Sequence, residues 1–258
     1  MSVLSEPRTR RIDFMGIRVD DVTMPETLKQ IHEFVRSGEP HKLFCINVAA
    51  YIAAHKDPSL HRFYESCDLL TVDGMGVYYA GRLLSLPFQE TVAGSYLMFE
   101  ILSLAKERNY KIYLLGSKPD IVATAAANLK VHYPGVTLSG CEHGYFSKTD
   151  ESEIVAKIAA SGANILFIGM SSPFKEQFVE RNFERLNVPV QIGVGGSIDV
   201  LGGVTKLPPR WLRTAGLEWV NRLAQEPERL WKRYLFSNTV FGLLVLKYLI
   251  WQCFSLEE

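Results

Sequence analysis

The sequence lacks the residue patterns that mark several common classes of enzyme. No Asp-x-Asp triplet occurs, so the usual pair of Mn²⁺ or Mg²⁺ ligands that holds a diphosphate is missing, and the six histidines show no metal-binding spacing. A P-loop and a Gly-x-Ser-x-Gly nucleophile elbow are absent as well. We therefore expect a protein that uses neither a bound metal nor another cofactor.

Cysteine and net charge are also scarce. The four cysteines lie apart in apolar stretches with no Cys-x-x-Cys pair, which indicates a reducing compartment and no zinc ribbon. Lys plus Arg and Asp plus Glu number 28 each, and a net charge of zero argues against a nucleic-acid partner. The segment from Met1 to Arg11 has no apolar core, so we expect no secretory signal there.

What the chain does have is an alternation of short β-branched runs and helical patterns, within 258 residues of which 47% are hydrophobic. Strands are predicted at Leu43–Asn47, Leu69–Val72, Lys111–Leu115, Val136–Ser139, Ile165–Ile168 and Val190–Val194. Helices are predicted at Pro25–Ser37, Pro58–Glu65, Gly76–Leu84, Ser95–Arg108, Ile121–Tyr133, Glu151–Ala160 and Phe174–Leu186. This alternation predicts an α/β fold with a Rossmann-like, mostly parallel sheet flanked by helices, and a hairpin around Met15-Gly16 precedes it.

The composition and the residue pattern of the chain change after about residue 203. Strand patterns stop, prolines cluster at Pro208-Pro209, and a basic, aromatic stretch and an apolar tail follow. We therefore divide the chain into an α/β core at residues 1–203 and a helical C-terminal appendage at residues 204–258.

In open α/β sheets, ligands bind beyond the carboxyl ends of the strands. The residues that follow the predicted strands are Asn47, Asp73-Gly74, Gly116-Ser117, Gly169 to Pro173, and Gly195-Gly196. Glycine recurs among them, as a backbone that approaches a ligand closely would require. These positions are the candidate ligand-binding residues.

The glycine-rich stretch from Gly193 to Asp199 follows a predicted strand, which favours contact between backbone N–H groups and a phosphate. It departs from Gly-x-Gly-x-x-Gly at Ile198, and this counts against a dinucleotide site. A tight strand-to-helix turn is the alternative, and spacing alone does not choose between the two.

Two further side chains have both a chemical and a structural interpretation. Asp73 would project a carboxylate from a strand end, as the general base of an inverting glycosyl transfer requires. Taken alone, however, an N-cap for the helix predicted at Gly76–Leu84 is the better interpretation of Asp73. Tyr145 would stack on a base or bond to a phosphate, and a packed aromatic ring is the alternative.

The appendage carries cations at helical spacing that would suit a diphosphate, and the alternative is a solvated helix face paired to Glu226 and Glu228. The cations are Arg222, Arg229, Lys232 and Arg233. The tail from Thr239 to Phe254 approaches the ~20 apolar residues of a membrane span, but Lys247 and Gln252 interrupt it. We predict an interfacial or shallowly inserted helix, with burial in the core or in an oligomer as the alternative.

From about Phe14 to Tyr234, the chain resembles the WecG/TagA/CpsF glycosyltransferase family. The most specific matches are Asp73-Gly74-Met-Gly76, Leu114-Leu115-Gly116, Tyr133-Pro134-Gly135, Gly144-Tyr145-Phe146, Gly193-Val-Gly-Gly-Ser-Ile-Asp199, Gly216-Leu-Glu-Trp219 and the block from Arg222 to Tyr234. The resemblance implies a peripheral enzyme on the inner face of the bacterial cytoplasmic membrane. It also implies transfer of N-acetylmannosamine, its uronic acid or another hexose from a UDP donor to a polyprenyl-diphosphate-linked saccharide, with inversion and without a metal.

The resemblance also assigns roles to individual residues. Asp73 becomes the general base, while Arg222 and Arg229 would close over the site and meet diphosphate charge. The UDP pocket would be lined by Tyr145, Gly195, Gly196 and Asp199. The substrate-binding set is completed by Asn47, Gly74, Gly116, Lys175 and Glu176.

The chain departs from the family's pattern near these residues. Thr91 stands where an Arg is usual, Ser95 where an Asp is usual, Cys45 where a Thr is usual and Lys175 where a Gln is usual. Because a cation is gone at position 91 and one has appeared at position 175, we hypothesise that positive charge moved within one rebuilt sugar or acceptor pocket.

Three functions compete at this point. The first is an inverting, metal-independent UDP-sugar transferase of cell-surface polysaccharide synthesis. The second, motivated by the changes at Thr91 and Ser95, is a non-catalytic nucleotide-sugar-binding subunit of an assembly complex. The third is a nucleotide-sugar enzyme of another class, such as a hydrolase or an NAD-dependent dehydrogenase, although the complete glycine motif that a dehydrogenase needs is absent.

Overall fold

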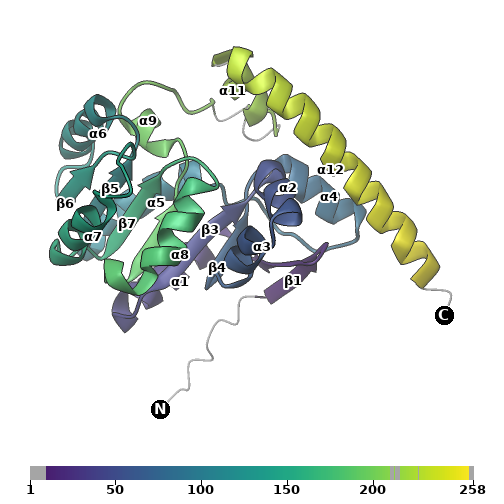
Figure 1. Ribbon diagram of the computed structural model, residues 1–258, viewed down its shortest axis with the longest axis horizontal. Coiled ribbons are helices and arrows are strands. Elements are labelled where there is room, and N and C mark those ends of the chain that lie inside the picture. The colour runs from purple at the N-terminus through teal and green to yellow at the C-terminus, as the bar shows by residue number, and fades with distance from the viewer. Residues whose placement is uncertain (1–9, 210–211, 213–215, 226, 256–258) are drawn as a thin grey trace.

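The computed structural model describes residues 10–209, 212, 216–225 and 227–255 (Figure 1). Six parallel strands form one sheet in the order β4-β3-β8-β7-β5-β6, and β1 and β2 form a separate antiparallel hairpin. The strands are β1 (Arg10–Phe14), β2 (Ile17–Asp21), β3 (His41–Ile46), β4 (Leu69–Val72), β5 (Lys111–Gly116), β6 (Thr137–Glu142), β7 (Ile165–Gly169) and β8 (Val190–Gly193). The helices are α1 (Met24–Ser37), α2 (Val48–Lys56), α3 (Pro58–Glu65), α4 (Met75–Leu83), α5 (Gly94–Arg108), α6 (Pro119–His132), α7 (Glu151–Ala160), α8 (Phe174–Leu186), α9 (Ser197–Leu201), α11 (Glu218–Gln225) and α12 (Pro227–Ser255).

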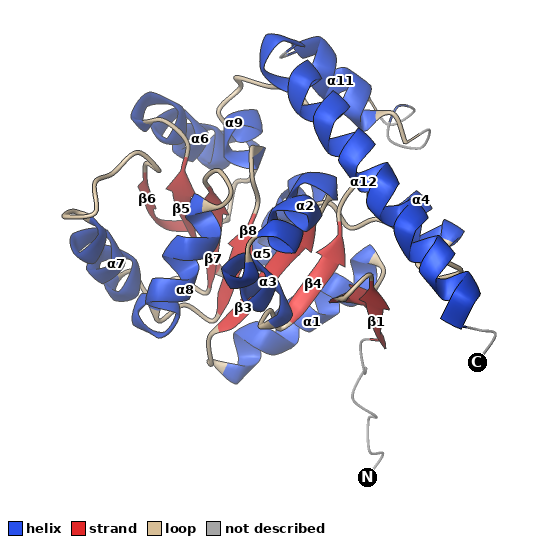
Figure 2. Cartoon of the chain, turned by 45° about the vertical axis from the view of Figure 1, so that its right-hand side comes forward, coloured by secondary structure: helices blue, strands red, loops and turns tan. Residues whose placement is uncertain are grey.

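Helices cover both faces of the sheet, because successive strand residues point to opposite sides and both sets are apolar (Figure 2). Phe44 and Ile46 face one core, which α2, α3, α7 and α8 close. Leu43 faces the other core, which α1, α5, α6 and α9 close. The predicted fold class, a mostly parallel sheet flanked by helices, is confirmed.

Each of the six predicted sheet strands is present, with small changes at the ends, and α3, α7 and α8 have the predicted bounds. The sequence prediction missed α2 and α9. Helix α2 is apolar nearly all round, since one side packs on the sheet and another contacts α12, so it shows no amphipathic period. Helix α9 has only five residues, too few for a periodic pattern to be seen.

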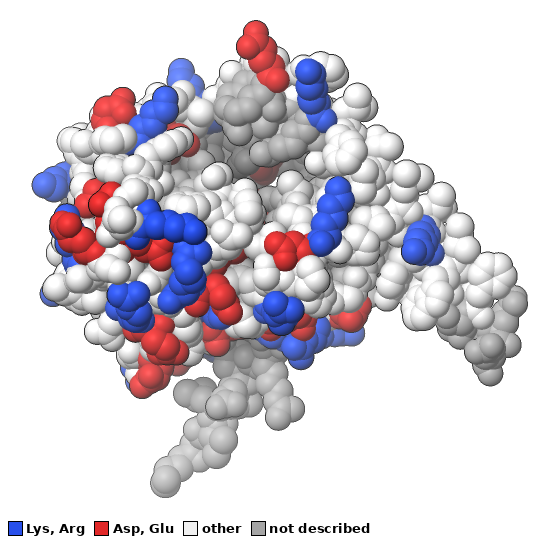
Figure 3. Space-filling view, viewed as in Figure 1, with Lys and Arg blue, Asp and Glu red and all other residues white. Residues whose placement is uncertain are grey.

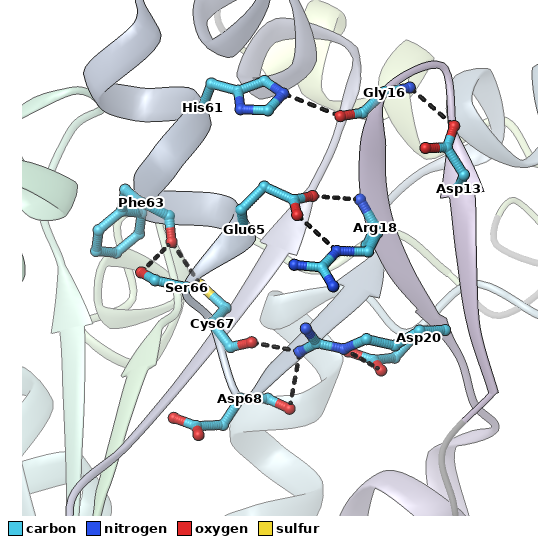
Figure 4. Close-up of polar contacts among 11 residues, drawn as sticks. Asp13, Gly16, Arg18, Asp20, His61, Phe63, Glu65, Ser66, Cys67 and Asp68 are labelled. Atoms are coloured by element: carbon cyan, nitrogen blue, oxygen red, sulfur yellow. Dashed lines mark hydrogen bonds and ion pairs between the residues drawn. The ribbon is translucent and has the colours of Figure 1, made fainter.

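The hairpin predicted around Met15-Gly16 is also present, and it lies beside β4, the outermost strand on that side of the sheet. Asp20, which is 1% exposed, accepts a hydrogen bond from the Leu70 backbone at 2.7 Å and pairs with Arg11 at 3.1 Å. Further contacts join the hairpin to α3 and to the segment that follows it, among them the ion pair of Arg18 with Glu65, the last residue of α3, at 2.6 Å (Figure 4). The hairpin thereby shields an edge strand that would otherwise be free to pair.

The C-terminal helix α12 runs along one side of the molecule beside α2 (Figures 1 and 2). One of its faces packs on the body of the protein, where the Phe241 ring lies 6.3 Å from the Phe14 ring and 5.6 Å from the Tyr51 ring. The stretch Tyr234–Gln252 is long and apolar enough to cross a membrane, but only 11% of it is buried in the protein. The alternative of a helix buried in the core is therefore wrong for most of this helix.

The buried face of α12 makes a first prediction. Phe241 is 6% exposed, so Phe241→Ala should lower the free energy of unfolding by about 3 kcal/mol, because it removes a packed ring and leaves a cavity. Phe254→Ala is the matched control, because Phe254 on the same helix is 69% exposed. Urea denaturation of the two variants measures the difference, and equal midpoints would contradict the packing described.

Candidate functional site

The carboxyl ends of the six parallel strands all lie on one side of the sheet, here called the sheet edge. The residues that follow the strands are therefore brought to the same side of the molecule. Ile46 pairs in register with Val72, Gly116 with Gly169, and Ile168 with Gly193. The positions singled out at the strand ends therefore share one edge of the sheet, as the sequence predicted.

Asp73 directly follows β4, and its neighbour across the edge is Asn47, which follows β3. The Asp73 backbone N–H donates to the Ile46 carbonyl at 2.9 Å, and Asn47 Nδ2 donates to Asp73 Oδ2 at 3.4 Å. Asn47 is itself held by α2, because its Oδ1 accepts from the Ala50 N–H at 3.0 Å. The N-cap of α4 is Gly74 at φ +85°, so the alternative that Asp73 is the cap of that helix is wrong.

Cys45 is the second-last residue of β3, and its thiol interacts electrostatically with the Asp73 carboxylate. The Thr71 hydroxyl lies 3.1 Å from Cys45 Sγ and 2.9 Å from the Val92 carbonyl, which adjoins Thr91. Burial raises the pKa of the Cys45 thiol to about 12, the Asp73 carboxylate adds to the rise, and the Lys175 ammonium opposes it. Lys175 therefore acts on Cys45, whereas the contact nearest to position 91 is that of the Val92 carbonyl with Thr71, and the hypothesis of a moved charge stays a prediction.

The burial of Cys45 makes a second prediction, about thiol reactivity. Because alkylation requires the thiolate and a pKa of about 12 leaves almost none at pH 8, Cys45 should react with iodoacetamide only after unfolding. Cys67 should behave in the same way, since burial also raises the pKa of its thiol. Partial burial raises the pKa of Cys141 too, but this residue is exposed, so it should react in the folded protein. Peptide mass mapping measures this order, and alkylation of Cys45 as fast as Cys141 would contradict the structure.

The glycine-rich stretch forms a tight turn from β8 into α9, with Gly195 at φ +55° and Gly196 at the N-cap. In that short helix, Asp199 Oδ1 accepts a hydrogen bond from the Ser117 hydroxyl, which follows β5. The tight turn is therefore present, and it does not conflict with the other interpretation, in which backbone N–H groups of this stretch contact a phosphate. The strand-end rule singles out Ser117, whereas the residue set implied by the family resemblance does not include it.

Gly116 has a packing reason to be glycine. A methyl group on it would lie 2.4 Å from the Gly169 carbonyl oxygen, at a φ of +145°. The segment at Gly144 packs against the same point, since a methyl group on Gly144 would lie 3.1 Å from Gly116 Cα and the Gly144 N–H donates to the Ser117 carbonyl at 2.9 Å.

Tyr145 and Phe146 point in different directions. Tyr145 is 71% exposed, so the alternative of a packed ring is wrong for it. The neighbouring Phe146 packs instead, at 5.9 Å from the Phe174 ring and 5.7 Å from the Phe178 ring. Tyr145 is thus held beside the edge with a free face, the arrangement that stacking on a base requires.

Lys175 and Glu176 open α8 and belong to a buried polar cluster. The Lys175 ammonium and the Tyr64 hydroxyl both donate to Glu176 Oε1, the latter at 2.7 Å. Glu176 is fully buried, and burial, aided by the Glu176 charge, raises the pKa of Tyr64 well above its usual value, so Tyr64 remains a neutral donor. Sequence reasoning missed Tyr64, which is 112 residues from its partner.

The cations of the appendage are described only in part. Arg222 lies within α11 and Arg229 within α12, but their side chains lie outside the described residues. Lys232 lies over the Trp231 ring at 5.5 Å from its centre. Figure 3 shows that charged side chains gather on the side of α7 and α8, whereas the ridge of α12 carries few.

Comparisons with known proteins agree with this geometry. The model of the glycosyl transferase WecG/TagA/CpsF family matches residues 12–253. An N-acetylglucosaminyldiphosphoundecaprenol N-acetyl-β-D-mannosaminyltransferase of Staphylococcus aureus (strain MW2) is 28% identical over 237 residues, which cover 90% of each chain. The protein of the same name from Bacillus subtilis (strain 168) is 31% identical over 202 residues, which cover 78% of this chain and 77% of that one.

The fold is a parallel α/β sheet, and over most of its length the chain matches a family model and relatives that are named as glycosyltransferases. These matches make the protein a glycosyltransferase. The chain belongs to the WecG/TagA/CpsF family, and the resemblance seen in the sequence is confirmed.

Proposed function

We propose that this glycosyltransferase moves a sugar from a UDP donor to a polyprenyl-diphosphate-linked saccharide, in the synthesis of a bacterial cell-surface polysaccharide. The relatives' names supply the first candidates: N-acetylmannosamine as the sugar and N-acetylglucosamine on diphospho-undecaprenol as the acceptor. The observation that carries the proposal is the position of Asp73 at the end of β4. Its carboxylate is hydrogen-bonded to Asn47, and it acts on the Cys45 thiol together with the charge of Lys175.

In the proposed reaction, UDP lies over the turns at Gly195-Gly196 and Ser117, with Tyr145 against the base and Asp199 in the wall of the pocket. Gly74 and Gly116 allow the backbone to come close, and Asn47 orients Asp73. The Asp73 carboxylate takes the proton from the acceptor hydroxyl as that oxygen bonds to the anomeric carbon, and the bond from this carbon to the UDP oxygen breaks. A single displacement of this kind inverts the configuration at the anomeric carbon.

The charge of the departing UDP has to be met by hydrogen-bond donors and cations. We propose that backbone N–H groups of the edge and the appendage residues Arg222 and Arg229 meet it, without a bound metal. The core, residues 1–203, would thus bind the donor, while the appendage, residues 204–258, would bind the lipid-linked acceptor and supply cations to the departing UDP.

The appendage would place the enzyme on the inner face of the cytoplasmic membrane. From Leu235 to Phe254, the outward face of α12 carries exposed apolar side chains, while the opposite face packs on the protein. The exposed residues are Leu235, Phe236, Leu243, Leu246, Ile250, Trp251 and Phe254. A helix fixed on one face and apolar on the other suits an orientation in the plane of the lipid surface better than a crossing of the bilayer.

The test is a donor panel. The full-length protein is mixed with a short-chain lipid diphospho-N-acetylglucosamine and, in turn, with each of a set of UDP-sugars, and the lipid product is weighed by mass spectrometry. The expected result is a gain of one sugar residue with one donor. If UDP binds but no donor yields a product, the protein is a nucleotide-sugar-binding subunit instead.

A further inference from the structure

Lys175 occupies a position that is unfavourable for a cation. It is the second residue of α8, and the N-terminal end of a helix repels positive charge. Its side chain is only 14% exposed, so solvent does little to relieve that repulsion. A cation held in such a place calls for an explanation in terms of what it faces.

The buried side of Lys175 is held by a carboxylate that is itself fixed. Glu176 is fully buried, and its Oε1 accepts from both Lys175 and Tyr64, whereas no described residue donates to its Oε2. The ammonium has three N–H donors, and Glu176 is its hydrogen-bond partner among the described residues. Donors therefore remain for a second oxygen.

The stem of Lys175 extends across the end of β8 toward the end of β3. A methyl group on Gly193 would lie 3.3 Å from Lys175 Cε, and the charge of Lys175 acts on the Cys45 thiol together with that of Asp73. In the sheet order, β8 lies between β3 and β7, so Lys175 stands between the Asp73 end of the edge and the Ser117 end. A donor whose nucleotide lies at Ser117 and whose anomeric carbon faces Asp73 passes over this point.

We propose that Lys175 binds an oxyanion of the sugar donor and so helps to set which donor is used. The inference rests on the proposed function and adds to it the group of the donor that Lys175 binds. Two oxyanions have this chemistry: a carboxylate on the transferred sugar and the diphosphate. Because the Lys175 side chain reaches past the end of β8 toward the end of β3, which adjoins Asp73 and the expected place of the transferred sugar, we expect the carboxylate, and hence a hexuronate donor rather than a neutral hexose.

The test measures binding, so it does not depend on turnover. Isothermal titration of the full-length protein with UDP, UDP-N-acetylmannosamine and UDP-N-acetylmannosaminuronate is carried out for the wild type, Lys175→Gln and Lys175→Arg. Lys175→Gln should weaken the uronate about 10-fold or more and the other two ligands little, and Lys175→Arg should retain most of the affinity, since a charge-assisted hydrogen bond is lost only in the first. The exposed Lys130→Gln on α6 is the control.

The double variant Lys175→Gln/Glu176→Gln removes both charges and so serves if the single variant fails to fold with Glu176 unpaired. An equal loss of affinity for all three ligands would assign the oxyanion to the diphosphate. Unchanged affinity for every ligand in a folded variant would show that Lys175 is only the counterion of Glu176 and overturn the proposal. If UDP itself fails to bind the wild type, the proposed function fails as well.

Discussion

Asp73→Asn should lower the rate of sugar transfer by about 10²- to 10⁴-fold, because the amide cannot take the proton from the acceptor hydroxyl. The variant keeps the size of the side chain and can still contact Asn47, which lies 3.4 Å away in the native protein. UDP affinity should change by less than about 2-fold, since the proposed nucleotide contacts come from Gly195-Gly196, Ser117 and Tyr145 and not from Asp73. The measurement is single-turnover transfer at saturating donor, with UDP binding by titration in parallel.

Asp57→Asn is the matched control. Asp57 is the N-cap of α3, away from the sheet edge, and Asn caps a helix about as well as Asp. This variant should transfer sugar at the native rate. Native turnover in Asp73→Asn would remove Asp73 from the role of general base, and a parallel loss of UDP affinity would assign it to donor binding instead.

Replacing Leu243, Leu246 and Ile250 by Gln should strongly weaken binding to lipid vesicles while leaving the fold intact. These side chains are 63%, 53% and 49% exposed on the outward face of α12, so the folded protein loses little when they become polar. At about 1 kcal/mol of apolar transfer for each side chain, the three changes should lower the vesicle partition coefficient about 100-fold. Sedimentation with vesicles measures the coefficient, and a thermal melt confirms the fold.

Val131→Gln provides the control for this second experiment. Val131 is 71% exposed on α6, on the opposite side of the molecule from α12 (Figure 1), so its replacement should not change vesicle binding. If the triple variant binds vesicles as well as the native protein does, the outward face of α12 does not contact lipid. An oligomer that dissociates in the triple variant would assign that face to a second copy of the chain.

The positions of the candidate residues could be predicted from the sequence because they depend on a local rule. Each buried β-branched strand is followed directly by the residue in question, so locating β3, β4 and β8 also located Asn47, Asp73 and Gly195. The N-cap of α4 was predicted wrongly as Asp73, because a local rule cannot separate two adjacent residues that both suit the position. Asp73 and Gly74 both suit a helix start, and only the backbone conformation at Gly74 decides between them.

Contacts between distant parts of the chain could not be predicted in this way. The hydrogen bond of Ser117 with Asp199 and that of Tyr64 with Glu176 join residues 82 and 112 positions apart, and no periodic pattern records such pairs. The packing of α12 on α2 belongs to the same group, because it buries a second side of α2 and so removes the amphipathic signal from that helix. The electrostatic surroundings of Lys175 emerge only from such contacts.

The central claim is a single displacement at the sheet edge with Asp73 as the base. Its most direct test is the anomeric configuration of the new linkage, measured by NMR on product made by the full-length protein in the presence of EDTA. We expect one new sugar linkage with the configuration opposite to that in the UDP donor, formed at the same rate with and without the chelator. Retention of the donor's configuration, or loss of the reaction in EDTA, would contradict the account.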